Sequence, residues 1–421
     1  MKHVSIDPAR RRPLLDQRGV ALPMAMIALL LLTSLLVAFA ALSATEPLIA
    51  NNHLRSAQAR ALAEAGLERA IWALSIGKNA PGTSGSIALP APGVTAAAPY
   101  DGSTLITVVS AAGTTIGGYT LRIVGVDKES ASVTSTGFTP NNDPNDTRTK
   151  AMKQITATVY TFPDLAINAP CALCVNGDLM VSGNSDIDSR SDGSCGSKNG
   201  TYTSGVTTVD SSSAAVHGLD GNNVKNEIGV PGGATSDIVV GAPTSDFNNF
   251  KFSDRDLNQL KEVAKKNGTY YQGSVTFNAG NYIPNGIVFI DTLSGNNIPT
   301  DPTQQNTSDF ASVTIHGNHS ADMTAGWTGM IVSNGTINIS GNVKLNGLIY
   351  AVNDLSYTGT GTGYVEGLVI SQNIRDTVAS SIDANSGGNA SIAFNCAKAK
   401  GGGATPSGYM LLAGTYKEVG Q

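Results

Sequence analysis

Charged and aromatic side chains are scarce in this sequence of 421 residues. Charged residues make up 14% of the chain, where about a quarter is usual, and aromatic residues make up 6%. Glycine alone supplies 47 residues, and serine, threonine and asparagine are concentrated in the second half. This composition excludes a mostly helical protein and favours β-strands connected by turns.

Basic residues are few once the amino-terminal segment is set aside. The chain carries 27 basic and 32 acidic residues, of which the first nineteen residues contribute five and two. The remaining chain therefore has 22 basic and 30 acidic residues, a net charge of −8. No basic cluster follows the apolar segment near the amino terminus, so we expect no nucleic-acid partner.

That apolar segment has no charge at all. Val20 to Thr45 is an uncharged run of 26 residues, which as a helix would span roughly 39 Å, more than the roughly 30 Å hydrocarbon core of a bilayer. A cleaved secretory signal has a shorter apolar region, so we expect a membrane-spanning helix. The first nineteen residues carry a net charge of +3, which predicts a cytoplasmic amino end and export of everything after Glu46.

The junction between the basic end and the apolar run carries a family resemblance. Gly19 is preceded by arginine and followed at once by the apolar segment, with "ALLLLTSLLV" at 28–37 and "RSAQARALAEAGLERAIWAL" at 55–74. Residues 17–76 resemble the amino-terminal region of PilX-type minor pilins of type IV pili, and also that of minor pseudopilin K of type II secretion. The resemblance implies that a prepilin peptidase cuts between Gly19 and Val20 on the cytoplasmic face and that the new amine of Val20 is methylated.

One position departs from the pattern of that family. Most pilins carry a glutamate five residues into the mature chain, and Met24 stands at the equivalent position. A carboxylate in an apolar bundle is tolerated only when it is paired, so a subunit with no neighbour to pair with does better without it. Met24 therefore suits a rare subunit, such as one at a filament tip. The alternative is a single-span anchor that is never cut.

The helical pattern continues beyond the membrane segment. Pro47 is expected to kink or restart the helix, and Gly77 to end it. Between them an apolar stripe follows steps of three and four residues, at Ala63, Leu67, Ala70, Ile71 and Leu74. We therefore expect a transmembrane and amphipathic helix over 20–76, behind a leader of residues 1–19.

Residues 80–162 are expected to form a small antiparallel sheet. Alternating apolar and polar residues predict four strands, at 103–110, 118–126, 130–138 and 153–162. Such strands bury one face of a sheet, and the end of the long helix is the natural cover. A match to the helix-on-sheet head domains of pilins is implied by the resemblance alone.

Residues 163–400 carry an internal repeat. "NGDLMVSGN" at 176–184 recurs as "NGTINISGN" at 334–342. A strand start of glycine and three apolar residues also recurs, at Gly286, Gly329, Gly347 and Gly367. The last three begin 18 and 20 residues apart, which favours the coils of a β-solenoid over the runner-up, a β-sandwich. The expected core of the coils is Ile331, Ile337, Ile339, Leu345, Ile349, Leu355, Val365 and Val369.

An embedded helix interrupts this β pattern. Ser253 is placed as its N-cap, and Leu257 and Leu260 share one face of a helix expected over 254–266. Such a helix would cap an open end of the solenoid, whose backbone edge would otherwise invite aggregation. Residues 401–421 remain as a carboxy-terminal tail.

Four cysteines lie in the exported part, where disulfides persist: Cys171, Cys174, Cys195 and Cys396. Three full pairings are open. We expect structural bridges, with Cys195 joined to one cysteine of the "CALC" pair across a short loop. A redox pair or half of a metal site at "CALC" is the alternative, and a redox pair would want thioredoxin-like surroundings that the sequence lacks.

Other groups of ligand-type residues are weak candidates, and we expect no metal and no cofactor. His316 and His319 lack a third zinc ligand. Asp186, Asp188 and Asp192 lie in a loop that could hold calcium, but they miss the EF-hand spacing and the closing glutamate. Solvated turn residues explain both groups.

An enzyme is the remaining rival, because β-solenoids also host polysaccharide-cleaving enzymes. Such chemistry needs two carboxylates, or a carboxylate and a base, held together on a groove. Lys344, Asp354 and Glu366 fall on different parts of the repeat. We therefore expect no catalytic site, and the discriminating observation is whether any two of these side chains converge in one cleft.

Together these features predict an α+β chain with a long membrane-spanning helix, a small antiparallel β head and a β-solenoid. The expected function is that of a minor pilin-like protein in type IV pilus assembly or at the pilus tip. Its expected partners are other pilins, a prepilin peptidase, the inner membrane, and a surface or polysaccharide ligand for adhesion. It would lie in the bacterial inner membrane with an exported domain, and in the pilus after processing. The other reading is a membrane-anchored extracytoplasmic scaffold outside any filament.

Overall fold

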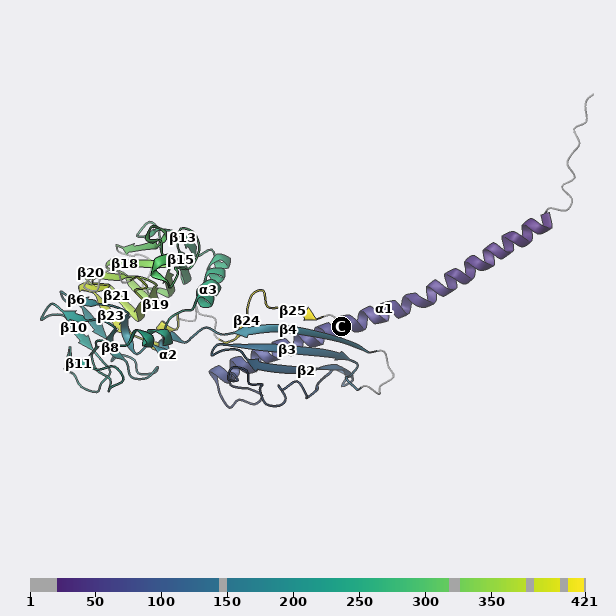
Figure 1. Ribbon diagram of the computed structural model, residues 1–421, viewed down its shortest axis with the longest axis horizontal. Coiled ribbons are helices and arrows are strands. Elements are labelled where there is room, and N and C mark those ends of the chain that lie inside the picture. The colour runs from purple at the N-terminus through teal and green to yellow at the C-terminus, as the bar shows by residue number, and fades with distance from the viewer. Residues whose placement is uncertain (1–20, 144–149, 318–325, 376–381, 402–407, 420–421) are drawn as a thin grey trace, which may run out of the picture. The chain divides into compact units, whose positions relative to one another are not determined.

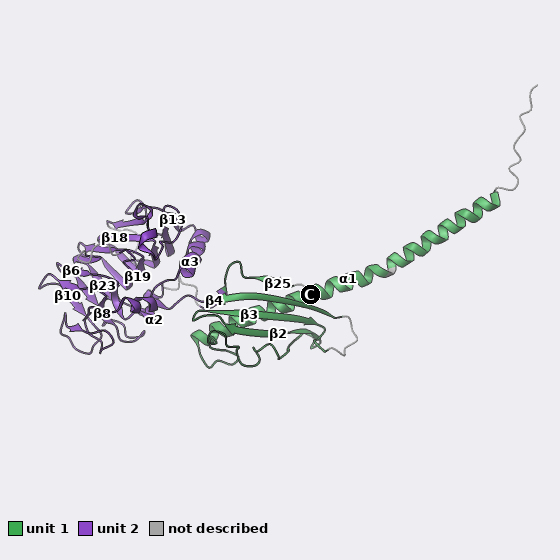
Figure 2. Ribbon diagram, viewed as in Figure 1, with its two compact units in different colours: residues 1–159, 411–421 green, residues 160–410 purple. Residues whose placement is uncertain are grey.

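The computed structural model describes residues 21–143, 150–317, 326–375, 382–401 and 408–419 (Figure 1). The chain divides into two compact units (Figure 2). Unit 1 is Met1–Val159 with Leu411–Gln421, and unit 2 is Tyr160–Met410.

Unit 1 consists of one long helix and an antiparallel sheet. Helix α1 runs over Ala21–Asn79. The strands are β1 (Ile106–Val109), β2 (Thr115–Gly125), β3 (Ser130–Thr139), β4 (Ala151–Tyr160), β24 (Met410–Leu411) and β25 (Lys417–Val419). Their order is β1-β2-β3-β4-β24, with β25 also paired to β4. The predicted antiparallel sheet is therefore confirmed, and part of the expected tail belongs to it as β24 and β25.

Helix α1 continues through both positions where the sequence suggested a change. Pro47 lies inside the helix and does not restart it, because 59 residues of helix supply many hydrogen bonds beside the one that proline removes. Gly77 also lies inside the helix. A Cβ at Gly77 would stand 1.7 Å from the carbonyl oxygen of Ile87, so this glycine makes room for the segment that follows.

The second half of α1 packs on the sheet through small side chains. The predicted stripe faces the core with exposures of 0–4%, at Ala63, Leu67, Ala70 and Leu74, while Ile71 is half-buried at its margin. At Gly137 of β3, a Cβ would stand 2.1 Å from the carbonyl oxygen of Ala59 and 2.5 Å from the amide nitrogen of Ala63. Helix and strand can approach this closely only because residue 137 has no side chain.

Unit 2 is built around two parallel sheets. The twelve-stranded sheet contains β5 (Cys171–Val175), β7 (Asp186–Asp188), β8 (Asn199–Thr203), β10 (Ala215–His217), β11 (Ile228–Gly229), β12 (Ile238–Val239), β13 (Tyr270–Gln272), β15 (Gly286–Asp291), β17 (Trp327–Ser333), β19 (Lys344–Ala351), β21 (Tyr364–Ser371) and β23 (Ser391–Phe394). The seven-stranded sheet contains β6 (Leu179–Val181), β9 (Thr207–Val209), β14 (Val275–Phe277), β16 (Ala311–His316), β18 (Gly335–Gly341), β20 (Leu355–Gly359) and β22 (Ala384–Gly388). From β14 to β23, successive strands alternate between the two sheets.

The short helices of unit 2 are α2 (Leu165–Asn168), α3 (Asp254–Asn267) and α4 (Cys396–Ala399), with 3₁₀ turns η1 (Thr244–Asn249), η2 (Pro302–Gln304) and η3 (Thr307–Asp309). Helix α3 follows the prediction closely. Ser253 caps it in a reciprocal capping box with Asp256, and Gly268 ends it at a φ of 72°. Its buried Leu257 and Leu260 face the unit, and it packs against β13 and β15, the end of the larger sheet.

The predicted core of the repeat is confirmed. All eight residues named above, from Ile331 to Val369, are 0–2% exposed. Their strands pair in parallel, for example Ile331 with Ile349 and Ile349 with Val369, which an antiparallel sandwich would not do. Equivalent apolar residues of successive strands therefore stack on one another.

The recurring glycines of the repeat are explained by this stacking. Gly286, Gly329, Gly347 and Gly367 lie in register on β15, β17, β19 and β21. A Cβ at Gly347 would stand 1.9 Å from the carbonyl oxygen of Gly329, and one at Gly367 would stand 1.9 Å from that of Gly347. A larger residue at Gly329, Gly347 or Gly367 would push the neighbouring strand away, which explains the glycine on these three strands.

The cysteine pairing differs from the sequence-based expectation. Cys171 is bonded to Cys174, and Cys195 to Cys396, with Cα–Cα distances of 5.7 and 5.6 Å. The expected bridge from Cys195 to the "CALC" pair is therefore wrong. Strand β23 pairs with β7, and Asp192 Oδ2 accepts the N–H of Cys396 at 2.8 Å. The fold thus brings a distant segment to Cys195, which spacing along the chain does not reveal.

Gly137→Val should loosen the contact between α1 and the sheet. The added side chain collides with the helix backbone, so unit 1 should lose about 1–3 kcal/mol of stability. Hydrogen–deuterium exchange followed by mass spectrometry should show faster exchange in β2, β3 and the second half of α1, and unchanged exchange in unit 2. Thr134→Val, on the same strand but the other face, is the control and should leave exchange unchanged. Equal protection in both variants would contradict the close-contact explanation.

Removing the two disulfides should have unequal effects. By the chain-entropy relation, a bridge across 201 residues stabilises by about 5 kcal/mol and a bridge across three residues by about 1.6 kcal/mol. Alanine at Cys195 and Cys396 should therefore lower the midpoint of urea unfolding more than alanine at Cys171 and Cys174. The signal is the fluorescence of Trp327, which is 1% exposed in unit 2. A larger loss from the short bridge would show that packing rather than loop closure dominates.

Candidate functional site

Helix α1 presents an apolar surface that no other described segment of the chain covers. From Leu22 to Leu54 its large apolar side chains are 55–73% exposed. Among the described residues, this is the one helix whose length and composition would allow it to cross a membrane. The predicted cleavage and methylation site, Gly19 and Val20, lies outside the described residues, directly before α1.

Three hydroxyl groups in this exposed half are hydrogen-bonded within the helix. The hydroxyls of Thr33, Ser34 and Thr45 each donate to the carbonyl oxygen three residues earlier, at 3.0, 2.9 and 2.8 Å. Hydroxyl hydrogens that are bonded inside the helix cost little in lipid. At the position where most pilins have glutamate, Met24 is 66% exposed and adds no charge. The exposed half of α1 is therefore suited to lipid or to a bundle of other helices.

Small residues on this half form two groups. Ala21, Ala25 and Ala28 share one face of the helix, and Ser34, Ala38 and Ala41 share another. Within each group the spacing is three or four residues, so the small side chains lie one above the other. Small residues let a second helix approach closely.

In unit 2, the outward positions of the seven-stranded sheet are mostly hydroxyl and amide side chains. One row across the seven strands, in register, is Thr276, Thr314, Asn338, Ser356, Asn385, Met180 and Thr208. Neighbouring strands lie about 4.8 Å apart, so the row places a hydroxyl or amide at nearly every step of that length. We call the surface formed by this row of seven residues the polar face.

A pocket of about 350 Å³ opens on the polar face between β18, β20 and β22. Asp354 and Asp383 line it, with Ser356 and Asn385 beside them. Burial raises the pKa of Asp354 to about 6, and the nearby Asp383 carboxylate adds to the rise. The Oδ1 atom of Asn385 is buried in this lining and has no hydrogen-bond partner. The pocket therefore combines two carboxylates with an unsatisfied amide.

The three residues weighed for catalysis do not meet in this pocket. Glu366 is engaged by Lys398 and accepts a hydrogen bond from Asn395 Nδ2 at 2.9 Å on the other sheet. Lys344 begins β19 and is not part of the pocket lining. The second carboxylate is Asp383, which the sequence did not single out, because only the register of β22 against β20 brings it beside Asp354.

The groups of ligand-type residues considered from sequence are spread apart or bonded elsewhere. Asp188 pairs with Arg190 at 2.8 Å, and Asp192 accepts the N–H groups of Ser194 and Cys396. Asp186, Asp188 and Asp192 do not bring their oxygens within ligand distance of one another. His316 ends β16 and is exposed, and His319 lies outside the described residues.

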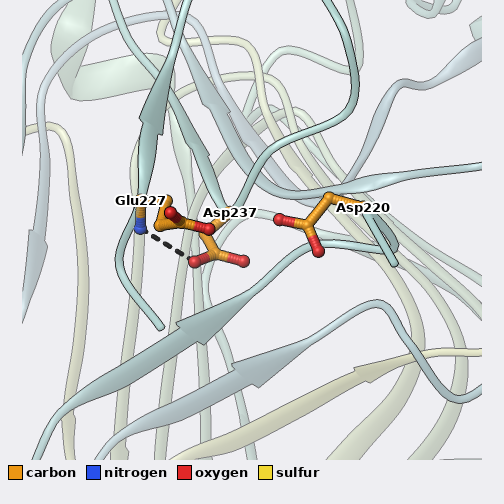
Figure 3. Close-up of side chains that lie close together, drawn as sticks. All are labelled: Asp220, Glu227 and Asp237. Atoms are coloured by element: carbon orange, nitrogen blue, oxygen red, sulfur yellow. Dashed lines mark hydrogen bonds between the residues drawn. The ribbon is translucent and has the colours of Figure 1, made fainter. Parts of the chain in front are cut away.

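A different acidic cluster is brought together by the fold, at Asp220, Glu227 and Asp237 (Figure 3). Their carboxylate oxygens lie within 4.8 Å of one another. Asp237 is 1% exposed and accepts the N–H groups of Gly218 and Glu227, at 2.6 and 2.8 Å. Asn222 Nδ2 bridges the other two carboxylates. Oxygen atoms of this kind suit calcium, but here each carboxylate already accepts hydrogen bonds from N–H donors of nearby segments. These bonds hold the segments of this part of unit 2 together.

Comparisons with known proteins give little guidance. No protein-family model matches the chain, and no curated protein matches it in sequence. Among solved structures, the chain is similar to the competence-associated pilin ComZ from Thermus thermophilus, with 12% identity and a TM-score of 0.28. That match covers 87% of this chain and 97% of the other. A TM-score of this size does not establish a shared fold.

Asp354→Asn should stabilise unit 2 at neutral pH but not in acid. The pKa of Asp354 is raised from 3.8 to about 6 in the fold, so the folded state holds this proton more tightly than the unfolded state. Wild-type stability should therefore fall as pH rises from about 4 to about 6, and the asparagine variant should lack that fall. Thermal unfolding of both proteins across this range checks the prediction.

The matched control is Asp301→Asn. Asp301 is exposed, and hydrogen bonds from Thr303 lower its pKa, so its charged form favours the fold. That variant should gain no stability at neutral pH. A gain in both variants would mean that general charge reduction, rather than the Asp354 environment, is the cause.

Proposed function

We propose that this chain is a minor pilin-like subunit of the type IV pilus or of a related pseudopilus. The observation that carries the proposal is the first half of α1, which has no charge before Glu46 and whose large apolar residues are 55–73% exposed, while its second half packs on an antiparallel sheet. An apolar surface of this size needs lipid or other helices around it. The resemblance of residues 17–76 to PilX-type minor pilins indicates which assembly the helix would enter, a type IV pilus or a related pseudopilus.

The proposed mechanism has three physical steps. The precursor is held in the inner membrane by residues 20–45, with its +3 leader in the cytoplasm. Cleavage between Gly19 and Val20 by a prepilin peptidase removes that positive charge. The freed helix then moves from lipid into a bundle of pilin helices, where its two groups of small residues allow close contact.

Unit 2 is proposed to be the exported β-solenoid that serves adhesion. Support comes from the alternation of successive parallel strands between two sheets and from the glycines stacked in register. The polar face offers hydroxyl and amide groups at regular spacing, which suits hydrogen bonding to the hydroxyl groups of a polysaccharide. The orphan Oδ1 of Asn385 marks where a ligand donor would bind.

We further propose that the role is structural rather than catalytic. Asp354 and Asp383 share a pocket, but Asp383 Oδ2 already accepts the N–H of Asp178 at 2.7 Å and so holds the turn before β6. A carboxylate committed to the backbone in this way is a poor partner for proton transfer to a substrate. The alternative role is a membrane-anchored scaffold that never enters a filament.

Leader cleavage tests the proposal directly. In the native host, the mature chain should begin at Val20 with a methylated amine, as measured by mass spectrometry of the amino-terminal peptide. Gly19→Leu should block the cut and leave the precursor in the membrane, whereas Gln17→Leu, which adds similar bulk two residues earlier, should be processed. A wild-type chain that still begins at Met1 would reject the pilin route and favour the anchored scaffold.

A further inference from the structure

Three buried polar side chains of unit 2 meet at the end of β15. They are Lys261 on α3, Asp291 at the end of β15, and Asn334 in the turn between β17 and β18. The side chains of Lys261 and Asp291 are 5% and 0% exposed, and Asn334 is 0% exposed. The group lies on three elements that are far apart in sequence.

The Asp291 carboxylate holds the amine and the amide side by side. Lys261 Nζ lies 2.8 Å from Asp291 Oδ2, and Asn334 Nδ2 lies 2.6 Å from Asp291 Oδ1. Each partner therefore contacts one oxygen of the same carboxylate. Attack on Asn334 requires Nζ to move from Asp291 Oδ2 toward the Cγ atom by rotation about the side-chain bonds of the lysine.

The surroundings keep water away and keep Asp291 in place. Tyr270 Oη donates to Asp291 Oδ2 at 3.0 Å, and the N–H of Thr292 donates to Oδ1 at 2.9 Å. Lys261 Nζ also donates to the carbonyl oxygen of Gly295 at 3.0 Å and lies 5.6 Å from the ring centre of Phe289. A nucleophile and an amide are thus enclosed together with one acid–base group.

One atom of the group has no partner. Asn334 Oδ1 is buried and accepts no hydrogen bond. Rotating the Asn334 side-chain amide by half a turn exchanges the positions of Nδ2 and Oδ1. Which of the two atoms faces Asp291 depends on whether Asp291 carries a proton. With Asp291 ionised, the nitrogen end faces it. With Asp291 protonated, its O–H would donate to the amide oxygen and polarise the carbonyl for attack.

We propose that Lys261 and Asn334 become joined by an intramolecular amide bond, with Asp291 as the proton carrier. The Lys261 ammonium first passes a proton to Asp291, which turns a buried ion pair into a neutral amine and a neutral acid. The neutral amine is the nucleophile. Its Nζ then attacks Cγ of Asn334, forming the new C–N bond.

The step is balanced without any other reactant. One proton leaves Nζ through Asp291, and one proton reaches Asn334 Nδ2 from the same carboxyl group. The bond between Cγ and Nδ2 breaks, and Nδ2 departs as ammonia. Lys261 and Asn334 are left as one amide, and Asp291 remains protonated with its O–H on the new carbonyl oxygen. The product contains no buried charge and no orphan carbonyl, and it ties α3 to the turn between β17 and β18.

Asn334 is a better electrophile here than Asp291 itself. The Asp291 carboxylate is bound on both of its oxygens, by Lys261 and Tyr270 at Oδ2 and by Asn334 and Thr292 at Oδ1. The amide of Asn334 has ammonia as its leaving group and a buried Oδ1 without a partner, which a proton donor can polarise. The two routes differ in product, because attack on Asp291 would release water.

Peptide mapping of the full-length protein tests the proposal. After reduction and alkylation of the cysteines and digestion with trypsin, the segments that contain Lys261 and Asn334 should appear as one linked species. That species should be lighter than the two separate peptides together by one ammonia, and trypsin should not cut after Lys261. The wild-type measurement needs no variant, so it does not depend on whether a variant folds.

Substitutions test the role of each of the three residues in forming the bond. Lys261→Met, Asn334→Ala and Asp291→Asn should each abolish the linked species, the last while keeping both reacting groups. Lys198→Met is the control, because Lys198 is 3% exposed but donates only to the carbonyl oxygens of Ile167 and Ala169. It should leave the link intact. Formation of the bridge between Cys195 and Cys396 reports folding in every variant.

Two results would overturn the proposal. The first is separate, unmodified peptides in the wild-type protein, which would leave a plain buried ion pair. The second is a link between Lys261 and Asp291 with loss of water, which would remove Asn334 from the chemistry. Because the three residues belong to unit 2, neither result depends on whether α1 enters a filament.

Discussion

The structure depends on helix α1, whose two halves need different surroundings. One half packs on a sheet of its own unit, and the other exposes apolar side chains that need a cover. The second half of α1 is fixed to its own sheet by alanine packing and by the missing side chain at Gly137. In the part of the chain that the structure describes, nothing covers the apolar side chains of the first half, which carries no charge before Glu46. Because both halves belong to one uninterrupted helix, whatever covers the first half also holds unit 1. Membrane anchoring and entry into a helix bundle are two solutions to the same physical requirement.

In unit 2, the core is formed by parallel strands that stack closely on one another. Glycines in register at 329, 347 and 367 let the backbones approach, and the apolar residues beside them stack into a continuous core. The inward positions are thereby committed to packing. The outward positions do not take part in this core, and on the smaller sheet they are mostly hydroxyl and amide groups. The scaffold and the surface proposed for binding therefore follow from the same two-residue alternation.

Charged residues are few, and those that are buried have specific partners. Lys198 is held by two backbone carbonyl oxygens, and burial lowers its pKa to about 8. Asp237 is bound by two backbone N–H groups, and Lys261 by Asp291. Placing an ionised group in the interior is costly unless hydrogen bonds compensate. Lys261 and Asp291 stand out because a buried amide shares their carboxylate, which turns a structural contact into one that can react.

The sequence alone determined the features that depend on local order. The uncharged run before Glu46, the capping of α3 by Ser253, the antiparallel strands of unit 1 and the eight core residues of the repeat all follow from short-range periodicity and capping chemistry. Only the tertiary structure decided which distant residues meet. The bridge between Cys195 and Cys396, the pairing of Asp354 with Asp383 and the group around Asp291 each depend on the register of strands and turns that lie many residues apart. Register is set by the combined packing of all the paired strands, and no single segment of sequence contains it.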